Sequence, residues 1–249
     1  MKKGGGRVKR ARKTVFLTLL LALLLAAGQG KGDGEAAVTA EGPAQVELDC
    51  PLVALTFDDG PRRSTTEELL DGLAQRGAHA TFFLVGEMIP GNEDLIMRME
   101  AEGHQIGTHS YDHVYLTGLN ARDFARQVDR TETMLTQILG REGFLLRPPY
   151  GRIDSAVEKR TDSPLILWSI DPEDWDDKNT DRIVEHITAN ARDGDVILLH
   201  DIYPTSVAAA LRVVDALHQK GFLFVTIEEL AHQRHVELTP GQTYRSFYP

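Results

Sequence analysis

Short apolar runs of strand-forming residues alternate along most of this chain with longer stretches in which apolar residues recur at helical spacing. The short runs lie at 52–57, 80–85, 105–108, 144–146, 165–170, 196–199 and 222–226. The longer, amphipathic stretches lie at 65–75, 92–102, 121–139, 180–192 and 206–220. Strands that alternate with helices predict a parallel sheet with right-handed crossovers. Seven strands in about 180 residues favour a closed or nearly closed α/β barrel, with an open doubly wound sheet as the alternative.

The ends of the predicted helices carry capping signals. A glycine follows each helical stretch, as is common at helix C-termini: Gly77, Gly103, Gly140, Gly194 and Gly221. Asn120 and Thr180 are predicted to be N-caps, because their side chains can accept a hydrogen bond from the first helical turn. The sequence after residue 232 leaves open whether the chain packs on the barrel or adds a short strand.

The first 28 residues predict a secretory signal peptide. A basic start without acidic residues precedes an apolar run at 15–27 and a group of small residues suited to cleavage. The run is shorter than the roughly 20 residues of a bilayer span; an uncleaved anchor is the alternative, and only that alternative predicts contact with a membrane. Residues 29–49 are expected to be a linker and N-terminal extension, 50–232 a single domain and 233–249 a C-terminal tail. Export would place the protein outside the cell or in the cell envelope.

Charge and cysteine content narrow the choice of partners. Cleavage of the signal peptide would remove seven of the 27 Lys and Arg, so 20 would face 37 Asp and Glu, a net charge of −17. This balance argues against nucleic acid and anionic lipid as partners, because phosphate binding needs clustered basic residues. Cys50 is the only cysteine, which excludes an internal disulfide and a Cys-rich zinc site; we expect its side chain to be buried.

Five polar clusters each follow a predicted strand. They are Thr56-Phe57-Asp58-Asp59-Gly60-Pro61, His109-Ser110-Tyr111-Asp112-His113, Arg147-Pro148-Pro149-Tyr150-Gly151, Asp171-Pro172-Glu173-Asp174-Trp175 and Leu198-Leu199-His200-Asp201. Any one of them also fits a plain turn or a solvated loop. Because α/β folds place their chemistry at the ends of strands, the five together favour catalysis.

The first two clusters predict a metal site. Asp58 and Asp59 end a strand before a turn, so both carboxylates can reach one cavity while one binds a cation and the other takes a proton. His109 and His113 are four residues apart, so a helical turn would place both imidazoles on one side. Together with Asp59 they would form a three-ligand site with open positions for water, which is typical of catalytic zinc.

The other three clusters supply groups for acid–base and oxyanion chemistry. Arg147 can hold a neighbouring carboxylate ionised, and the rigid prolines after it can aim the backbone N–H of Tyr150 at a developing oxyanion. His200 leaves a fully apolar run and is placed to act as an acid. Asp174 can orient a histidine, and Trp175 can form a wall of a groove.

Taken in order, the five clusters resemble the motifs of the polysaccharide deacetylases of carbohydrate esterase family 4, whose domain is also called the NodB-homology domain. The resemblance covers about residues 50–232 and departs at no catalytic position. It implies a distorted (β/α)7 TIM-like barrel with a single catalytic domain. It also implies removal of acetyl groups from N-acetylated sugars of peptidoglycan or chitin, or of O-acetyl groups from xylan. Residues 195–210 look most like the bacterial peptidoglycan N-acetylglucosamine deacetylases.

The resemblance also implies a role for each matching residue. By resemblance, Asp59, His109 and His113 bind a divalent metal, usually Zn²⁺ and alternatively Co²⁺, Ni²⁺ or Mn²⁺. The resemblance further implies that Asp58 is the catalytic base, tethered by Arg147, and that His200 is the catalytic acid, oriented by Asp174. It also implies that Tyr150 supplies the oxyanion N–H and that Leu198 and Trp175 line the pocket for the acetyl methyl group.

These inferences lead to one main hypothesis and two alternatives. The main hypothesis is a monomeric, metal-dependent hydrolase that removes N-acetyl groups from N-acetylglucosamine or N-acetylmuramic acid in cell-wall glycan. The first alternative is a chitin-oligosaccharide deacetylase or an O-acetyl xylan esterase. The second is a glycan-binding module that has lost catalysis, which the retained ligand set and His200 disfavour.

Overall fold

The computed structural model describes residues 50–249, so the predicted signal peptide and linker at 1–28 and 29–49 lie outside the described residues. Within the described part, no helix is both long and apolar enough to cross a bilayer. Cys50 is half-buried and packs at the edge of a core cluster, which corrects the expectation of a fully buried side chain.

A parallel sheet forms one wall of the fold. Its strands lie in the order β3-β2-β1-β5, with bounds β1 (Leu52–Asp58), β2 (Thr81–Leu84), β3 (Gln105–Thr108) and β5 (Val196–His200). A further strand, β6 (Leu223–Phe224), pairs with the first residues of β1. It lies on the same edge of β1 as β2, which pairs with the last residues of β1. All of these pairs are parallel, as the alternation of strands and helices predicts.

Single bridges close the sheet into a distorted barrel. Parallel bridges join Thr108 to Leu146 and Leu146 to Leu165, which begins β4 (Leu165–Ile166). A last parallel bridge joins Ile170 to Ile197 in β5, the strand at the other end of the sheet, so the barrel closes. This confirms the predicted barrel. The run at 144–146 is a single bridge residue rather than a strand, and two prolines that lack a backbone N–H follow shortly after it.

Strand β1 divides its side chains between the two sides of the wall. Val53, Leu55 and Phe57 belong to the core cluster that also contains helix residues. Leu52 and Ala54 belong to the cluster inside the barrel. Because successive strand residues point to opposite faces, residue 58, at the end of the strand, is on the inner face.

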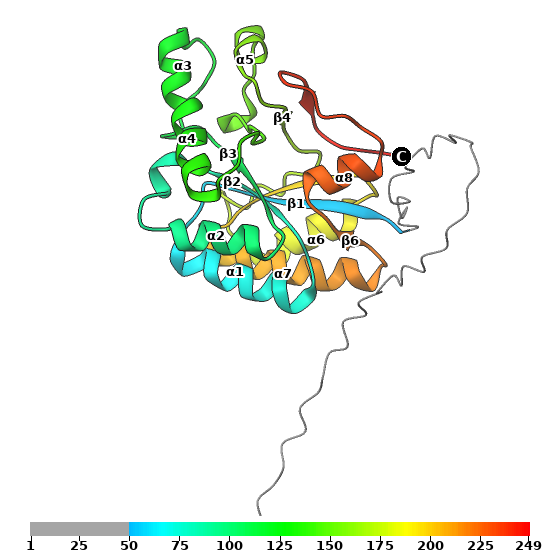
Figure 1. Ribbon diagram of the computed structural model, residues 1–249. Helices are drawn as coiled ribbons and strands as arrows, with labels where there is room; N and C mark the ends of the chain where they lie inside the picture. Colours follow the sequence, from blue (N-terminus) through cyan, green and yellow to red (C-terminus); the bar gives the residue numbers. More distant parts are fainter. Residues whose placement is uncertain (1–49) are drawn as a thin grey trace, which may run out of the picture. The chain divides into compact units, whose positions relative to one another are not determined.

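Helices pack on the outside of the wall. They are α1 (Arg63–Arg76), α2 (Glu93–Ala101), α6 (Thr180–Asn190) and α7 (Pro204–Gln219), and α1, α2 and α7 lie side by side along the sheet in Figure 1. The apolar faces of α1 and α7 are fully buried there, through Leu69, Leu70, Leu73, Val213, Val214 and Leu217. Both ends of each of these helices agree with the predicted amphipathic stretches to within two residues.

The predicted helix over 121–139 is divided into α3 (Ala121–Gln127) and α4 (Asp129–Leu139). Val128 between them keeps right-handed dihedrals (φ −96°, ψ −61°), so the division is a local irregularity. Several short elements were not predicted: α5 (Ser155–Arg160), α8 (Ile227–Gln233) and the single turns η1 (Gly86–Met88) and η2 (Pro149–Gly151). They are too short to show a helical period, although a Thr226–Glu229 capping box marks the start of α8.

The caps agree in part with the sequence. Asn120 accepts a hydrogen bond from the backbone N–H of Asp123, as expected. Thr180 is wrong as an N-cap: Asn179 caps α6 by accepting from Arg182 N–H, and Thr180 is the first helical residue. Both residue types can cap a helix, and the one-residue shift puts Thr180 Oγ1 in a bond to the carbonyl oxygen of Thr205 instead.

The C-terminal residues do both of the things that the sequence left open. Strand β7 (Thr243–Tyr244) pairs in parallel with β4. Beyond it, Phe247 N–H donates to the carbonyl oxygen of Gly194 at 2.7 Å, and its ring is buried. The tail therefore packs on the barrel and extends its wall beside β4.

Candidate active site

The polar clusters meet in one pocket at the carboxyl ends of the parallel strands. The pocket has a volume of about 450 Å³ and is lined by Asp58, Asp59, His109, His113, Tyr150, Trp168, Asp171, Trp175, Leu198, His200 and Tyr203. Eight of the ten residues predicted from the sequence are in this lining. The other two, Arg147 and Asp174, are fully buried behind it, where each contacts a residue that faces the pocket.

Sequence reasoning missed three lining residues, Trp168, Asp171 and Tyr203. Trp168 lies in a run that was counted as strand core, and its side chain is half-buried. Asp171 begins the fourth cluster, but the sequence assigned it no role. The available signal was the position of Asp171 directly after the apolar run 165–170, which also contains Trp168.

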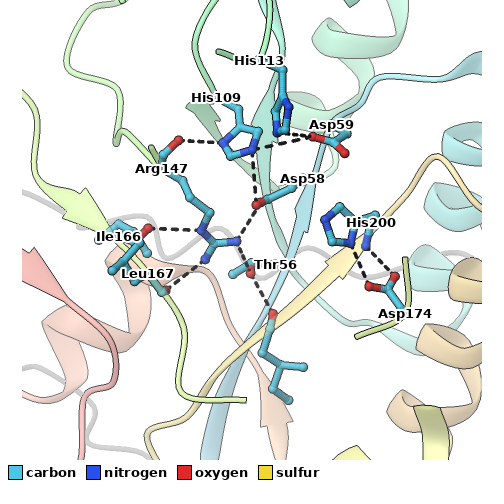
Figure 2. Close-up of polar contacts among 11 residues, drawn as sticks. Thr56, Asp58, Asp59, His109, His113, Arg147, Ile166, Leu167, Asp174 and His200 are labelled. Carbon is cyan, nitrogen blue, oxygen red and sulfur yellow. Dashed lines mark hydrogen bonds and ion pairs between the residues drawn. The ribbon is translucent and has the colours of Figure 1, made fainter. Parts of the chain in front are cut away.

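Asp59, His109 and His113 come together as a candidate metal site. One ligand atom from each lies within 4.8 Å of the others. Asp59 Oδ1 is 3.3 Å from His113 Nε2 and 3.7 Å from His109 Nε2 (Figure 2). Asp59 Oδ1 is also buried without a hydrogen-bond partner in the described residues, which is costly unless a cation neutralises it. The donor set and the unpartnered oxygen therefore fit a divalent metal.

His109 is held in the tautomer that a metal ligand needs. Its Nδ1–H donates to the backbone carbonyl of Arg147 at 2.6 Å, which leaves Nε2 facing Asp59. Burial lowers the pKa of His109 below its ordinary value, although the nearby carboxylates oppose this, so the neutral imidazole is favoured.

The two histidines are not brought together by a helical turn, contrary to the sequence prediction. The chain from 109 to 113 is a loop after β3, and Ser110 and His113 have positive φ values of 62° and 56°. The rings are still only 4.9 Å apart between centroids. Asp59 and Tyr150 also have positive φ, at 72° and 61°. Such strained residues concentrate where a site needs a particular backbone path.

Arg147 is the central buried cation of the site. Its side chain is inaccessible to solvent, and Nη1 donates to Asp58 Oδ1 at 2.8 Å and to Thr56 Oγ1 at 2.7 Å. Nε and Nη2 donate to the carbonyl oxygens of Ile166 and Leu167 (Figure 2). The guanidinium thus holds Asp58 in place, and the other carboxylate oxygen of Asp58 lies 3.6 Å from His109 Nε2.

His200 and Asp174 form a second carboxylate–imidazole pair. His200 Nδ1 is 2.8 Å from Asp174 Oδ1, and the backbone N–H of His200 donates to Asp174 Oδ2 at 2.9 Å. Burial opposes the charge on His200, but the hydrogen bond and charge of Asp174, with the charges of Asp58 and Asp59, outweigh it and raise the pKa of His200 to about 9. Because Nδ1 is occupied, Nε2 is the nitrogen available to a ligand.

Asp201, directly after His200, supports the turn that carries Asp59. Burial raises the pKa of Asp201 to about 7, and Thr66 Oγ1 donates to its carboxyl group. A Cβ at Gly60 would overlap this carboxyl group, so the close approach requires glycine there. Asp201 was in the fifth cluster, but the sequence assigned it no role.

Apolar and aromatic side chains complete the pocket. Leu198 is only 3% exposed, whereas Trp175 is 51% and Tyr150 53% exposed. The Tyr150 ring stacks on Tyr115 with centroids 4.3 Å apart and also contacts His113. The pocket therefore has a small apolar contact at Leu198 and broad aromatic walls at its rim.

The fold is a parallel α/β barrel whose pocket brings two histidines and a carboxylate together around one point. A second carboxylate and a carboxylate-paired histidine lie beside them. These are the parts of a metal-dependent hydrolase. A family model described as polysaccharide deacetylase matches residues 45–163 of this chain. The peptidoglycan-N-acetylmuramic acid deacetylase PdaC of Bacillus subtilis is 39% identical over 179 residues, which are 72% of this chain and 38% of that protein.

Two further relatives match this chain over most of their own length. A peptidoglycan-N-acetylglucosamine deacetylase of Bacillus cereus is 35% identical over 192 residues, covering 74% of this chain and 90% of that protein. A solved family 4 acetyl xylan esterase from Clostridium thermocellum, in complex with a cobalt ion, is 28% identical with a TM-score of 0.75, over 78% of this chain and 98% of that chain. The chain belongs to the polysaccharide deacetylase family, as the five clusters indicated, although it spans about two fifths of the length of PdaC.

Proposed function

We propose that this protein is a metal-dependent deacetylase that removes N-acetyl groups from cell-wall glycan and releases acetate. The observation that carries the proposal is the Asp59–His109–His113 cluster, which lies in one pocket with Asp58 and His200. Relatives named as peptidoglycan deacetylases support the glycan substrate. We further propose that the protein acts as a monomer outside the cell or in the cell envelope, without a nucleic-acid partner.

The metal would be held by Asp59 Oδ1, His109 Nε2 and His113 Nε2. A bound divalent cation supplies Lewis-acid polarisation of an acyl oxygen and lowers the pKa of water. We propose Zn²⁺, which two imidazoles and one carboxylate suit, although the same donors accept Co²⁺, Ni²⁺ or Mn²⁺. The acetyl xylan esterase in complex with cobalt supports a divalent metal.

The chain's own residues would move the protons. Asp58, held in place by the hydrogen bond from Arg147 Nη1, accepts a proton from the water that attacks the acetyl carbonyl carbon. The backbone N–H of Tyr150 donates to the oxyanion that forms. His200 then protonates the sugar nitrogen as the C–N bond breaks, which gives acetate and a free amine. Asp174 orients His200 through Nδ1.

Substrate selection would begin at Leu198 and Trp175, which line the pocket where the acetyl methyl group would lie. This contact suits an amide and an ester equally, because both pass through the same oxyanion. Chitin oligosaccharides and O-acetyl xylan therefore remain alternative substrates.

Acetate release from peptidoglycan, chitin oligosaccharides and acetylxylan, assayed in parallel with and without a chelator, tests the proposal. We expect the highest kcat/KM on peptidoglycan and loss of release on all three after chelation, with recovery when Zn²⁺ is returned. Fastest release from acetylxylan would favour the esterase. Binding of glycan without acetate release by metal-loaded protein would favour the non-catalytic module, and release that persists without metal would contradict the assignment.

Asp174→Asn is expected to move the alkaline limb of the pH–rate profile to lower pH. His200 acts as an acid only while protonated, and its raised pKa of about 9 keeps it protonated through neutral pH. Loss of the carboxylate removes the strongest group that raises this pKa, so the protonated fraction falls at lower pH. The measurement is kcat against pH. Asp176→Asn, an exposed residue of the same loop, is the matched control; an unmoved limb in Asp174→Asn would show that His200 is not the acid.

A further inference from the structure

A second hollow adjoins the active-site pocket on the side of the candidate metal ligands. It has a volume of about 500 Å³ and is lined by Asp59, Arg62, Val85, Met88, His113 and Ile202. Asp59 and His113 also line the active-site pocket. The two spaces therefore border each other at these two side chains, and we call the second one the Arg62 hollow.

Arg62 gives this hollow a charge that the pocket lacks. Among the residues that line the two spaces, it is the only Lys or Arg, and the pocket presents the carboxylates of Asp58, Asp59 and Asp171. Arg62 Nη1 donates to the carbonyl oxygen of Ile202 at 3.0 Å, which positions the exposed guanidinium. Its neighbour Arg63 pairs with Asp94, whereas Arg62 forms no ion pair within residues 50–249.

Three of the other five residues that line the hollow, Val85, Met88 and Ile202, are apolar; the remaining two are Asp59 and His113. Val85 is 6% exposed and Met88 36% exposed, and both line the hollow together with Ile202 and Arg62. A guanidinium beside a small apolar wall matches a carboxylate carried on a short, methyl-bearing arm. A neutral sugar has no anionic group that could pair with the guanidinium of Arg62.

We propose that the Arg62 hollow binds the lactyl group of N-acetylmuramic acid, with its carboxylate on Arg62 and its methyl group against Val85 and Met88. This rests on the proposed function, which places the acetamido group beside Asp59 and His113. The lactyl ether is on the ring carbon next to the one that bears the acetamido group, and the two spaces meet at the same two residues. The sugar that loses its acetyl group is therefore muramic acid, in glycan whose lactyl carboxylate is free of peptide.

The test compares three glycans of equal length with metal-loaded protein. They are peptide-free glycan of alternating N-acetylglucosamine and N-acetylmuramic acid, the same glycan with peptide stems on the lactyl groups, and a chitin oligosaccharide. We expect Arg62→Gln to lower the ratio of kcat/KM between the peptide-free glycan and the chitin oligosaccharide by roughly 10-fold to 100-fold, the usual loss for a hydrogen bond to a charged group. Arg62→Glu should lower it further, and Arg62→Lys less. Arg63→Gln is the matched control and should leave the ratio unchanged.

Each outcome decides the proposal. Mass spectrometry should find the acetyl group missing from muramic acid in the peptide-free glycan; loss from glucosamine instead would overturn it. An unchanged ratio in both Arg62→Gln and Arg62→Glu would overturn it even if both rates fall. An Arg62 effect confined to the stem-bearing glycan would assign the hollow to peptide carboxylates and overturn the lactyl assignment.

Failure of the proposed function would give a different result from failure of the lactyl subsite. In that case wild-type protein releases no acetate from any of the three glycans. Calorimetric binding of the peptide-free glycan would then still test the subsite. Tighter binding by wild type than by Arg62→Gln, with weaker binding at higher salt, would support it, and equal affinity would refute it.

Discussion

Asp58→Asn is expected to lower kcat for acetate release by roughly 10²-fold to 10⁴-fold, the usual contribution of a residue that transfers a proton. An amide is nearly the same size as a carboxyl group, and its oxygen can still accept a hydrogen bond from Arg147 Nη1. Arg147 also keeps its bonds to Thr56, Ile166 and Leu167, so the protein should remain folded. The measurements are steady-state kinetics and circular dichroism.

The metal content of the purified variants distinguishes a residue that acts as the base from one that binds the metal. Asp58→Asn should retain stoichiometric metal, because Asp59, His109 and His113 are intact. Asp59→Asn, the adjacent and equally conservative change, should lose metal as well as activity. Asp58→Asn protein with normal turnover would remove Asp58 as the base, and loss of metal from it would make Asp58 a ligand.

The parts of the site that the sequence predicted are those that depend on short-range order. Residue 58 lies on the inner face of β1 because strand residues alternate, and His200 leaves β5 at the same end of the sheet because the two strands are parallel. A list of strand ends thus locates most of the pocket. The i, i+4 spacing of the histidines predicted their proximity for the wrong reason, because a loop with positive φ values brings them together.

The parts that were missed depend on contacts between residues distant in sequence. Nothing local distinguishes Trp168 or Tyr203 from other aromatic residues, and they face the pocket only because loops after separate strands converge there. Arg62 follows the first cluster and looks like an ordinary surface residue beside Arg63. Its contact with Ile202, 140 positions away, places it over the hollow. Such placement requires the closed barrel and is not encoded in periodicity.

Arg147→Met is expected to lower the free energy of unfolding by about 3–5 kcal/mol, the usual cost of breaking one side of a buried ion pair. Methionine is a flexible, apolar residue that can fill much of the space of the arginine stem. It leaves the carboxylate of Asp58, only 2% exposed, without its guanidinium partner. Urea denaturation at neutral pH measures the change.

A double-mutant cycle identifies the uncompensated charge as the cause. Asp58→Asn/Arg147→Met removes both charges, so it should be more stable than Arg147→Met alone. Arg63→Met is the matched control: Arg63 also meets a carboxylate, that of Asp94, but the two side chains are 43% and 67% exposed, so its loss should cost less than about 1 kcal/mol. If Arg147→Met proves as mild as Arg63→Met, or the double variant is the least stable of the set, Arg147 does not serve to hold a buried charged base.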